Sequence, residues 1–298
     1  MQVLVTGSTG LVGSSLIPRL VEGGHHVTRL VRRAAGATDE IRWDPEAGVL
    51  DAAPLEGIGA VVHLAGESIA VGRWTQARKA RIRDSRVKGT RLLSETLAGL
   101  DRPPKVLVSA SAIGCYGDRG DEWLDESSPR GTGFLADVCR VWEDAAQAAA
   151  ERNIRVVLTR FGIILSPRGG ALAKMLTPFR LGLGGCVGNG RQYYSWISLD
   201  DAVGAIRHAL DEESLGGAVN VVAPNPVTNR EFTKTLGRVL RRPTLFPMPA
   251  PVARLAFGEM ADALLLASSR VKPARLLDSG YTFAHPTLEE ALGDLLGK

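Results

Sequence analysis

Short runs of apolar residues alternate along this chain with longer segments in which apolar residues recur every three or four positions. The first run, residues 3–5, is followed after a glycine-rich turn by residues 11–21, whose apolar residues have helical spacing. Strands that alternate with helices in this way predict an α/β fold with a parallel, doubly wound sheet. The further strands expected in the first half are residues 27–31, 41–43, 60–64, 105–109 and 155–159, and the helices are residues 74–97 and 134–150.

The pattern changes beyond residue 160, where glycine-rich loops separate shorter elements. Thr228 followed three residues later by Glu231 predicts a capping box that opens a helix ending near residue 240. The chain from residue 247 onward is helical by pattern, with proline-rich joints. The other elements expected here are helices at residues 171–181 and 200–210 and strands at residues 193–197 and 219–222.

The turn at residues 7–13 has the sequence GSTGLVG and lies between the first strand and the first helix. In this layout the free N–H groups and the dipole of the helix N-terminus can bind the pyrophosphate of a dinucleotide. Gly7 would permit the tight turn, Gly10 would let the backbone approach the phosphates, and Gly13 would let helix and strand pack closely. The spacing is G-x-x-G-x-x-G rather than G-x-G-x-x-G. The alternative is a glycine-rich turn that binds no ligand.

Two arginines, Arg32 and Arg33, follow the second expected strand. A site that prefers NAD usually offers an acidic residue there to the ribose 2′-hydroxyl. Guanidinium groups instead attract a 2′-phosphate, and one guanidinium can bind it through two hydrogen bonds. We therefore expect NADP(H) rather than NAD(H). The alternative is a solvated basic turn.

Composition narrows the class of protein. The chain has 298 residues, of which 45% are hydrophobic, but no apolar run reaches the about 18 residues of a membrane-spanning helix. With no signal-peptide pattern at the start, we expect a cytoplasmic protein that does not bind membranes. The net charge of +4 is spread along the chain without the basic, aromatic-rich stripe of a nucleic-acid-binding protein. The three cysteines form no C-x-x-C pair, so we expect neither a metal site nor a disulfide framework.

Several motifs together resemble those of the extended short-chain dehydrogenase/reductase superfamily. More narrowly, the chain is similar to the atypical, nucleoside-diphosphate-sugar epimerase-like branch that has a small C-terminal domain. The resemblance implies a Rossmann-type NADP-binding domain at residues 1–160 that later elements rejoin, a mixed α/β substrate lobe at residues 161–245 and a small helical domain at residues 246–298. The motifs are GSTGLVG (7–13), HLAGESI (63–69), SRVKGTRLL (85–93), SASAIGCYG (109–117), FLADVCRVWE (134–143) and PFRLGLGGCVGNGRQYYSWI (178–197).

The resemblance also assigns residues to the cofactor. The strand end at Leu64, Ala65 and Gly66 would pass the middle of the cofactor, and Arg86 would lie near its phosphates or ribose. For Arg86 the alternative is an ion pair on the surface of a helix. The residues that would hold the adenosine end or form the turn beside it are Gly7, Thr9, Gly10, Leu11, Val12, Gly13, Arg32 and Arg33.

One departure from the superfamily concerns catalysis. Most members use Tyr-x-x-x-Lys with a Ser or Thr: the Lys lowers the pKa of the Tyr and holds the nicotinamide ribose, and the Tyr acts as general acid or base. None of the four tyrosines here is followed by Lys at that spacing. Aligning Glu143 with the Glu that follows the Lys in many relatives places Leu135 at the Tyr position and Cys139 at the Lys position. Ser111 matches the Ser/Thr position.

Three other residues are candidates for work at the substrate. Tyr116 lies close to Ser111 in sequence and could replace the missing tyrosine, although a Tyr-Gly pair is often structural in relatives. Gln192 and Trp196 fall where extended relatives contact a nucleotide-sugar. The catalytic candidates are thus Ser111 and Tyr116, and the substrate candidates are Gln192 and Trp196.

Two functions are compatible with these residues. The first is an enzyme that uses NADP(H) for oxidoreduction or epimerisation of a polar small molecule that could be nucleotide-linked. The second is a catalytically weak protein that senses NADP(H) or acts in an assembly. Neither requires a nucleic-acid or membrane partner, and both leave a homodimer open.

Overall fold

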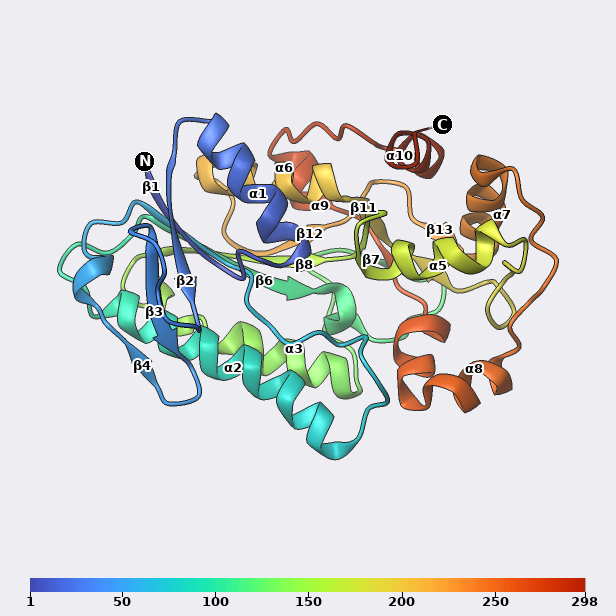
Figure 1. The fold of residues 1–298 in the computed structure, drawn as a ribbon, viewed down its shortest axis with the longest axis horizontal. Helices are drawn as coiled ribbons and strands as arrows, with labels where there is room; N and C mark the ends of the chain where they lie inside the picture. The colour runs from blue at the N-terminus through green and yellow to red at the C-terminus, as the bar shows by residue number, and fades with distance from the viewer. Residues whose placement is uncertain (298) are drawn as a thin grey trace.

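An eight-stranded sheet forms the centre of the computed structural model, which describes residues 1–297 (Figure 1). Within these residues, every pair of neighbouring strands in the sheet is parallel except β3 and β4. The order reverses at β1, which lies between β2 and β5. This confirms the predicted α/β class with a doubly wound sheet. The strands in spatial order are β12 (Gly217–Val221), β8 (Arg155–Phe161), β6 (Val106–Ala112), β5 (Ala60–His63), β1 (Gln2–Thr6), β2 (His26–Val31), β3 (Glu40–Asp44) and β4 (Val49–Leu50).

Helices cover both faces of this sheet. Side chains alternate along a strand, so Val3 and Val5 of β1 pack toward one face and Leu4 packs toward the other. The helices on the Val3 face are α1 (Leu11–Glu22) and α6 (Leu199–Asp211), and those on the Leu4 face are α2 (Gln76–Ala98), α3 (Phe134–Asp144) and α4 (Gln147–Ala150) (Figure 1).

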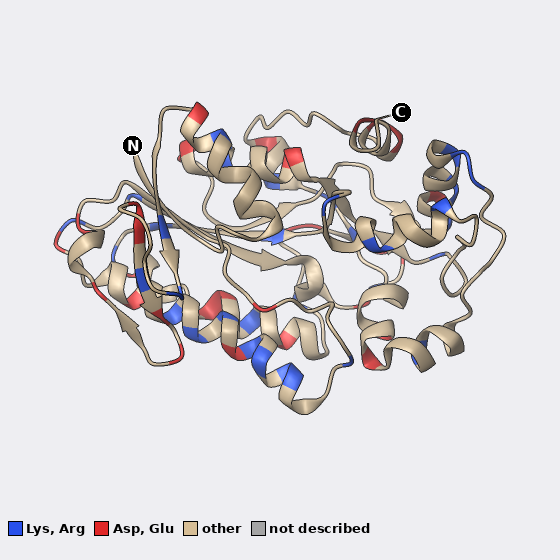
Figure 2. Ribbon diagram, viewed as in Figure 1, with Lys and Arg blue, Asp and Glu red and all other residues tan. Residues whose placement is uncertain are grey.

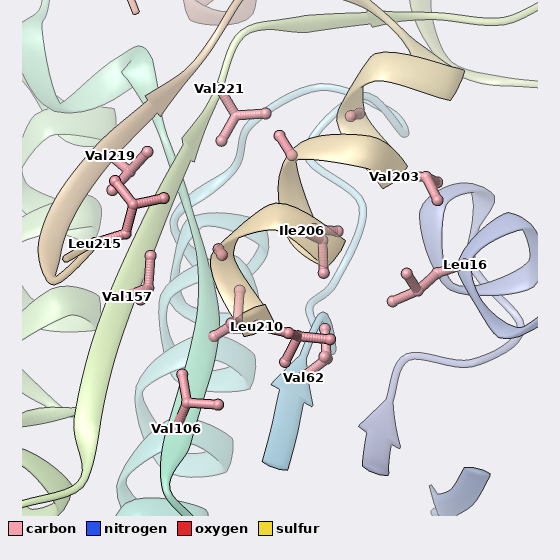
Figure 3. Close-up of a cluster of buried hydrophobic side chains, with 14 of the residues drawn as sticks. Leu16, Val62, Val106, Val157, Val203, Ile206, Leu210, Leu215, Val219 and Val221 are labelled. Atoms are coloured by element: carbon pink, nitrogen blue, oxygen red, sulfur yellow. The ribbon is translucent and has the colours of Figure 1, made fainter. Parts of the chain in front are cut away.

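Segments that follow residue 160 complete the first sheet and its core. Helix α6 packs Ile206 and Leu210 toward valines of the central strands, and its Val203 lies on the side that faces Leu16 of α1 (Figure 3). Strand β12 adds to the outer edge of β8 in parallel. The interleaving expected from the resemblance is therefore present, and the cofactor half is not a contiguous stretch of chain.

A second, smaller lobe packs around Trp196, Phe232 and Leu236. It includes α5 (Gly170–Arg180), α7 (Asn229–Leu240) and α10 (Leu288–Leu295), and Thr228 with Glu231 forms the predicted capping box of α7. The small strand pairs are β9 (Ile163–Leu165) with β11 (Trp196–Ser198), β10 (Tyr193–Tyr194) with β13 (Val227–Thr228), and β7 (Trp123–Leu124) with β14 (Arg270–Val271). The remaining helices are α8 (Ala250–Phe257), α9 (Ala274–Asp278), two 3₁₀ turns (Ala53–Leu55 and Ile113–Tyr116) and a π-helix (Ala261–Leu266).

Three sequence predictions of elements differ from the structure. The helix expected at residues 134–150 ends at Asp144, because the Ala146 N–H bonds the carbonyl of Glu143 in a tighter turn, and α4 follows. The strand expected at residues 193–197 is divided at Ser195 between two sheets. The tail is not wholly helical, since it contains β14, which pairs with β7. Its last helix, α10, packs into the core of the second lobe. The predicted domain limits stay a prediction.

Charge and hydropathy add two observations. Helix α2 is predominantly basic, with seven lysine or arginine residues and two acidic residues (Figure 2). Among the helices of residues 1–297, none is both long enough and apolar enough to cross a membrane.

Candidate functional site

The turn between β1 and α1 requires its glycines for steric reasons. Gly7 has a φ of +66°, and a Cβ there would lie 2.7 Å from the carbonyl carbon of Leu64. A Cβ on Gly13 would lie 2.3 Å from the carbonyl oxygen of Gly7, so any side chain would separate the helix from the turn. A Cβ on Gly10 would meet only that same oxygen, at 3.2 Å. The turn therefore has the tight geometry predicted for Gly7 and Gly13.

The first turn of α1 presents unused donors. Within residues 1–297, the N–H groups of Leu11, Val12 and Gly13 bond no protein acceptor, and the N-cap residue Gly10 has no side chain to cap them. Unpaired N–H groups at a helix N-terminus, with the positive end of the helix dipole, suit an anionic ligand. The residues present thus fit the pyrophosphate of a dinucleotide.

The two arginines after β2 have different surroundings. Arg33 forms a bidentate pair with Glu40, with Nη1 2.8 Å from Oε2, and this pair together with the N–H of Gly36 lowers the pKa of Glu40 to about 2. Arg32 is exposed and has no ion pair within the described part of the chain. The expectation of two available guanidinium groups is therefore reduced to one, because Glu40 on the adjacent strand neutralises Arg33.

Beneath the strand end at residues 64–66, a buried series of hydrogen bonds links β1, β5 and α2. The Thr6 hydroxyl oxygen accepts the N–H groups of Leu64 and Ala65, both at 3.1 Å, so its own proton points to His63 Nδ1 at 2.8 Å. His63 Nε2 then donates to the Thr90 hydroxyl at 3.0 Å. Burial lowers the pKa of His63 to about 4, which keeps the ring neutral. These hydrogen bonds fix the backbone of residues 64 and 65, over which the cofactor is expected to lie.

Two of these positioning residues, His63 and Thr90, escaped the sequence analysis, as did Trp142, whose indole N–H also donates to Thr90 at 2.9 Å. All three lie within the quoted motifs, and His63 and Trp142 are adjacent in sequence to residues that were singled out. A polar residue inside an otherwise apolar strand, as His63 is, was the signal available in the sequence.

Arg86 is a partly buried residue on the inward-facing side of α2 rather than a member of a surface ion pair. Its Nη1 donates to the carbonyls of Glu67 and Ile82, both at 2.9 Å, and burial lowers its pKa. The guanidinium lies 5.0 Å from the ring centre of Trp142 on α3 and packs against Gly66. The nearby carboxylate of Glu67 is already paired with Arg78. The surface ion-pair alternative is therefore wrong.

Ser111 is held by a buried carboxylate. Its hydroxyl donates to Glu143 Oε1 at 2.7 Å. Glu143 also accepts two hydrogen bonds from Arg160, at 2.8 and 2.9 Å, and one from Arg130 at 2.8 Å. The hydrogen bonds and charge of Arg160 hold the pKa of Glu143 below its usual value despite burial. Ser111 thus has a fixed orientation, and its oxygen can still accept a hydrogen bond.

The Tyr116 hydroxyl is engaged on both sides. It donates to Asn220 Oδ1 at 2.8 Å and accepts from Arg160 at 3.0 Å, and the residue is fully buried. Burial raises its pKa to about 12. This geometry gives Tyr116 a structural role and does not support the proton transfer expected of it.

The positions of the missing tyrosine and lysine carry no ionised group. Leu135 packs against Gly114 and joins an apolar cluster with Trp74. The Cys139 thiol is buried, lies 3.6 Å from the carbonyl of Ala112 and has a pKa raised to about 11 by burial. Neither can act as a general base at neutral pH.

The two expected substrate contacts lie in the protein interior. Gln192 Nε2 donates to the carbonyls of Val187, at 3.0 Å, and Leu265, at 2.8 Å. Trp196 is fully buried and its indole N–H donates to the Asn225 carbonyl at 3.1 Å. Both side chains hydrogen-bond the backbone of other segments, so the expectation that they contact a substrate is wrong.

Two family models match the sequence. The model described as the NAD dependent epimerase/dehydratase family matches residues 3–222, which include the glycine turn, β5, Ser111 and Glu143. The chain belongs to this epimerase/dehydratase family. A domain of unknown function, DUF1731, matches residues 248–295. The relationship and the distinct C-terminal segment predicted from the motifs are both confirmed.

Members of the family share most of the length of this chain. The epimerase family protein Mb2239 of Mycobacterium bovis is 46% identical over 291 residues, 98% of this chain and 96% of that protein. The crystal structure of human epimerase family protein SDR39U1 (isoform 2) with NADPH is 35% identical, covers 100% of both chains and has a TM-score of 0.92. A nucleoside-diphosphate sugar epimerase from Corynebacterium glutamicum is 38% identical, with a TM-score of 0.83 over 100% of this chain and 58% of that one.

Proposed function

We propose that this epimerase/dehydratase-family chain binds NADP(H) and is an oxidoreductase or epimerase for a polar, nucleotide-linked small molecule. The observation that carries the proposal is the row of unpaired N–H groups at α1 beside the unpaired Arg32. The N–H row suits a pyrophosphate and the guanidinium suits a 2′-phosphate. The NADPH found with the human relative supports the same cofactor.

The residues divide the work of holding such a cofactor. Leu11, Val12 and Gly13 would bind the pyrophosphate, and Arg32 would bind the 2′-phosphate. The strand end at residues 64–66, braced by Thr6, would carry the middle of the molecule. Bound NADP(H) would supply hydride exchange. Ser111, whose proton is committed to Glu143, would orient a substrate hydroxyl by accepting its hydrogen bond.

A second unpaired cation supports a substrate that carries phosphate. The Arg270 guanidinium lies between two aromatic rings, 4.0 Å from the ring centre of Trp123 and 4.5 Å from that of Tyr193. Its buried Nε has no hydrogen-bond partner within residues 1–297. A fixed and unpaired guanidinium is the group that a diphosphate would recruit.

The test is stopped-flow absorbance of protein-bound NADPH mixed with a panel of carbonyl compounds and nucleotide-sugars. We expect NADPH to stabilise the chain against heat more than NADH does, because a ligand that prefers the native state raises its stability. We also expect one compound class to oxidise the bound NADPH. Absence of any NADPH binding would refute the whole proposal, whereas tight binding without turnover would refute only the enzymatic part.

A second candidate function is NADP(H) sensing without turnover. It is favoured by one observation, the apolar or neutral side chains of Leu135 and Cys139 where a tyrosine and lysine are expected. It predicts that a partner protein binds differently with and without NADPH. A pulldown whose composition does not change with NADPH would contradict it.

A further inference from the structure

The position of Arg86 relative to the strand order is informative. In a doubly wound sheet a dinucleotide lies across the crevice where the strand order reverses. Here the reversal is at β1, with β2 and Arg32 on one side and β5 and β6 on the other. If Arg32 takes the adenosine end, the nicotinamide half lies over the ends of β5 and β6. Arg86 packs against Gly66, directly after β5, and is therefore on the nicotinamide side.

The protein fixes Arg86 but does not neutralise it. One nitrogen, Nη1, is used by two backbone carbonyls, and the face of the guanidinium is covered by the Trp142 ring. Trp142 is itself held by its hydrogen bond to Thr90. Within residues 1–297, Arg86 forms no ion pair, and its Nε and Nη2 atoms make no hydrogen bond. An oriented, desolvated guanidinium with unused donors can hold the hydroxyl groups of a ligand.

Helix α3 lacks a cation at the position that aligns with the superfamily lysine. Cys139 and Trp142 are three residues apart and lie on the same side of α3, so Arg86 stacks beside the position that aligns with the superfamily lysine. Cys139 is neutral there. Two other nearby arginines, Arg78 and Arg160, are already paired with Glu67 and Glu143. Arg86 is thus the unpaired cation at this site.

We propose that Arg86 holds the hydroxyl groups of the nicotinamide ribose, a task supplied from α2 in this chain instead of by a lysine on α3. The inference rests on the proposed binding of NADP(H). Because a guanidinium does not give up its proton near neutral pH, Arg86 positions the cofactor and does not transfer protons. The pyrophosphate contact, which the sequence left open for Arg86, falls instead to α1.

The experiment compares two ligands that differ by the ribose alone. 2′-Phospho-ADP contains both phosphates of the pyrophosphate, and 2′-phospho-ADP-ribose adds the second ribose without the nicotinamide ring. Isothermal titration calorimetry gives their dissociation constants for the unsubstituted chain and for Arg86→Gln. We expect Arg86→Gln to weaken 2′-phospho-ADP-ribose by about tenfold, about 1.4 kcal/mol, and 2′-phospho-ADP by less than about twofold.

The matched control is Arg83→Gln, which removes an exposed arginine from the same helix and should change neither constant. Arg86→Lys should restore part of the ribose affinity because it keeps the charge but loses the planar stack on Trp142. If Arg86→Gln does not fold, the same comparison with Arg86→Lys replaces it.

Each outcome separates the inference from the proposed function. Equal weakening of both ligands by Arg86→Gln would assign Arg86 to the phosphates or to the fold and overturn the inference, and so would no weakening of either. If the unsubstituted chain binds 2′-phospho-ADP but gains nothing from the ribose, only the inference fails. If it binds neither ligand nor NADPH, the proposed function fails and the inference fails with it.

Discussion

Glu143 offers a test of how the buried network beside Ser111 is stabilised. The carboxylate is 2% exposed and accepts four hydrogen bonds, one from Ser111, two from Arg160 and one from Arg130. Glu143→Gln keeps the size and shape of the side chain but replaces one accepting oxygen with an NH₂ group. Whichever way the amide turns, the NH₂ meets an N–H donor of Arg160, and the buried guanidinium loses its counter-charge.

The magnitude follows from the burial of both partners. The Arg160 side chain is 6% exposed, so water does not replace the lost carboxylate. Removing one partner of a buried ion pair costs about 3–5 kcal/mol, largely because the remaining charge is left unpaired. For a chain of this length the melting temperature falls by roughly 2 °C per kcal/mol, so we expect a fall of about 6–10 °C.

The assay is urea and thermal unfolding at neutral pH, with Glu289→Gln as the matched control. Glu289 also pairs with an arginine, Arg238, but the two side chains are 59% and 63% exposed. Exposed pairs contribute about 0–1 kcal/mol, so Glu289→Gln should change the free energy of unfolding very little. If Glu143→Gln changed the free energy of unfolding no more than Glu289→Gln does, the network would not stabilise the fold as reasoned.

Two further predictions concern the cofactor turn and its support. Arg32→Gln should reduce the preference for NADPH over NADH by about tenfold or more, as expected for a lost charge-assisted contact. Arg33→Gln should reduce this preference less, because Arg33 is paired with Glu40. Thermal shifts with both cofactors measure the preference, and equal effects of the two substitutions would contradict the prediction. His63 has a folded pKa of about 4, below its ordinary 6.5, so the unfolded chain takes up the proton first and the free energy of unfolding should fall as pH drops from 6.5 toward 4. His63→Gln should lose this part of the pH dependence in urea unfolding, and an unchanged pH dependence would show that another group causes it.

Local features of the sequence predicted the structure best. The glycine turn, the capping box at Thr228 and the order of strands and helices depend on residues that are near one another in the chain. Gly7 is a clear case, because its sequence context predicted a tight turn and its backbone has the positive φ that such a turn requires.

Features that depend on packing between distant segments could not be predicted from the sequence. Arg33 is neutralised by Glu40 because β2 and β3 pair in parallel, and that pairing is absent from any sequence motif. Gln192 has the polarity of a ligand contact, but its amide bonds a carbonyl 73 residues away. The motif assigned Arg86 to the cofactor, but its packing against the Trp142 ring of α3 depends on contacts that no motif specifies.

The position of β12 at the outer edge of β8 has a consequence for the synthesis of the chain. As the ribosome releases the polypeptide, strand β8 appears about sixty residues before residues 217–221, its neighbour in the sheet. During that interval the outer edge of β8 has unpaired N–H and C=O groups, and the side chains that α6 later covers stay exposed to water. Delayed pairing of this kind slows folding and favours association between incomplete chains. We therefore expect the chain to be prone to aggregation in the interval between release of β8 and release of β12.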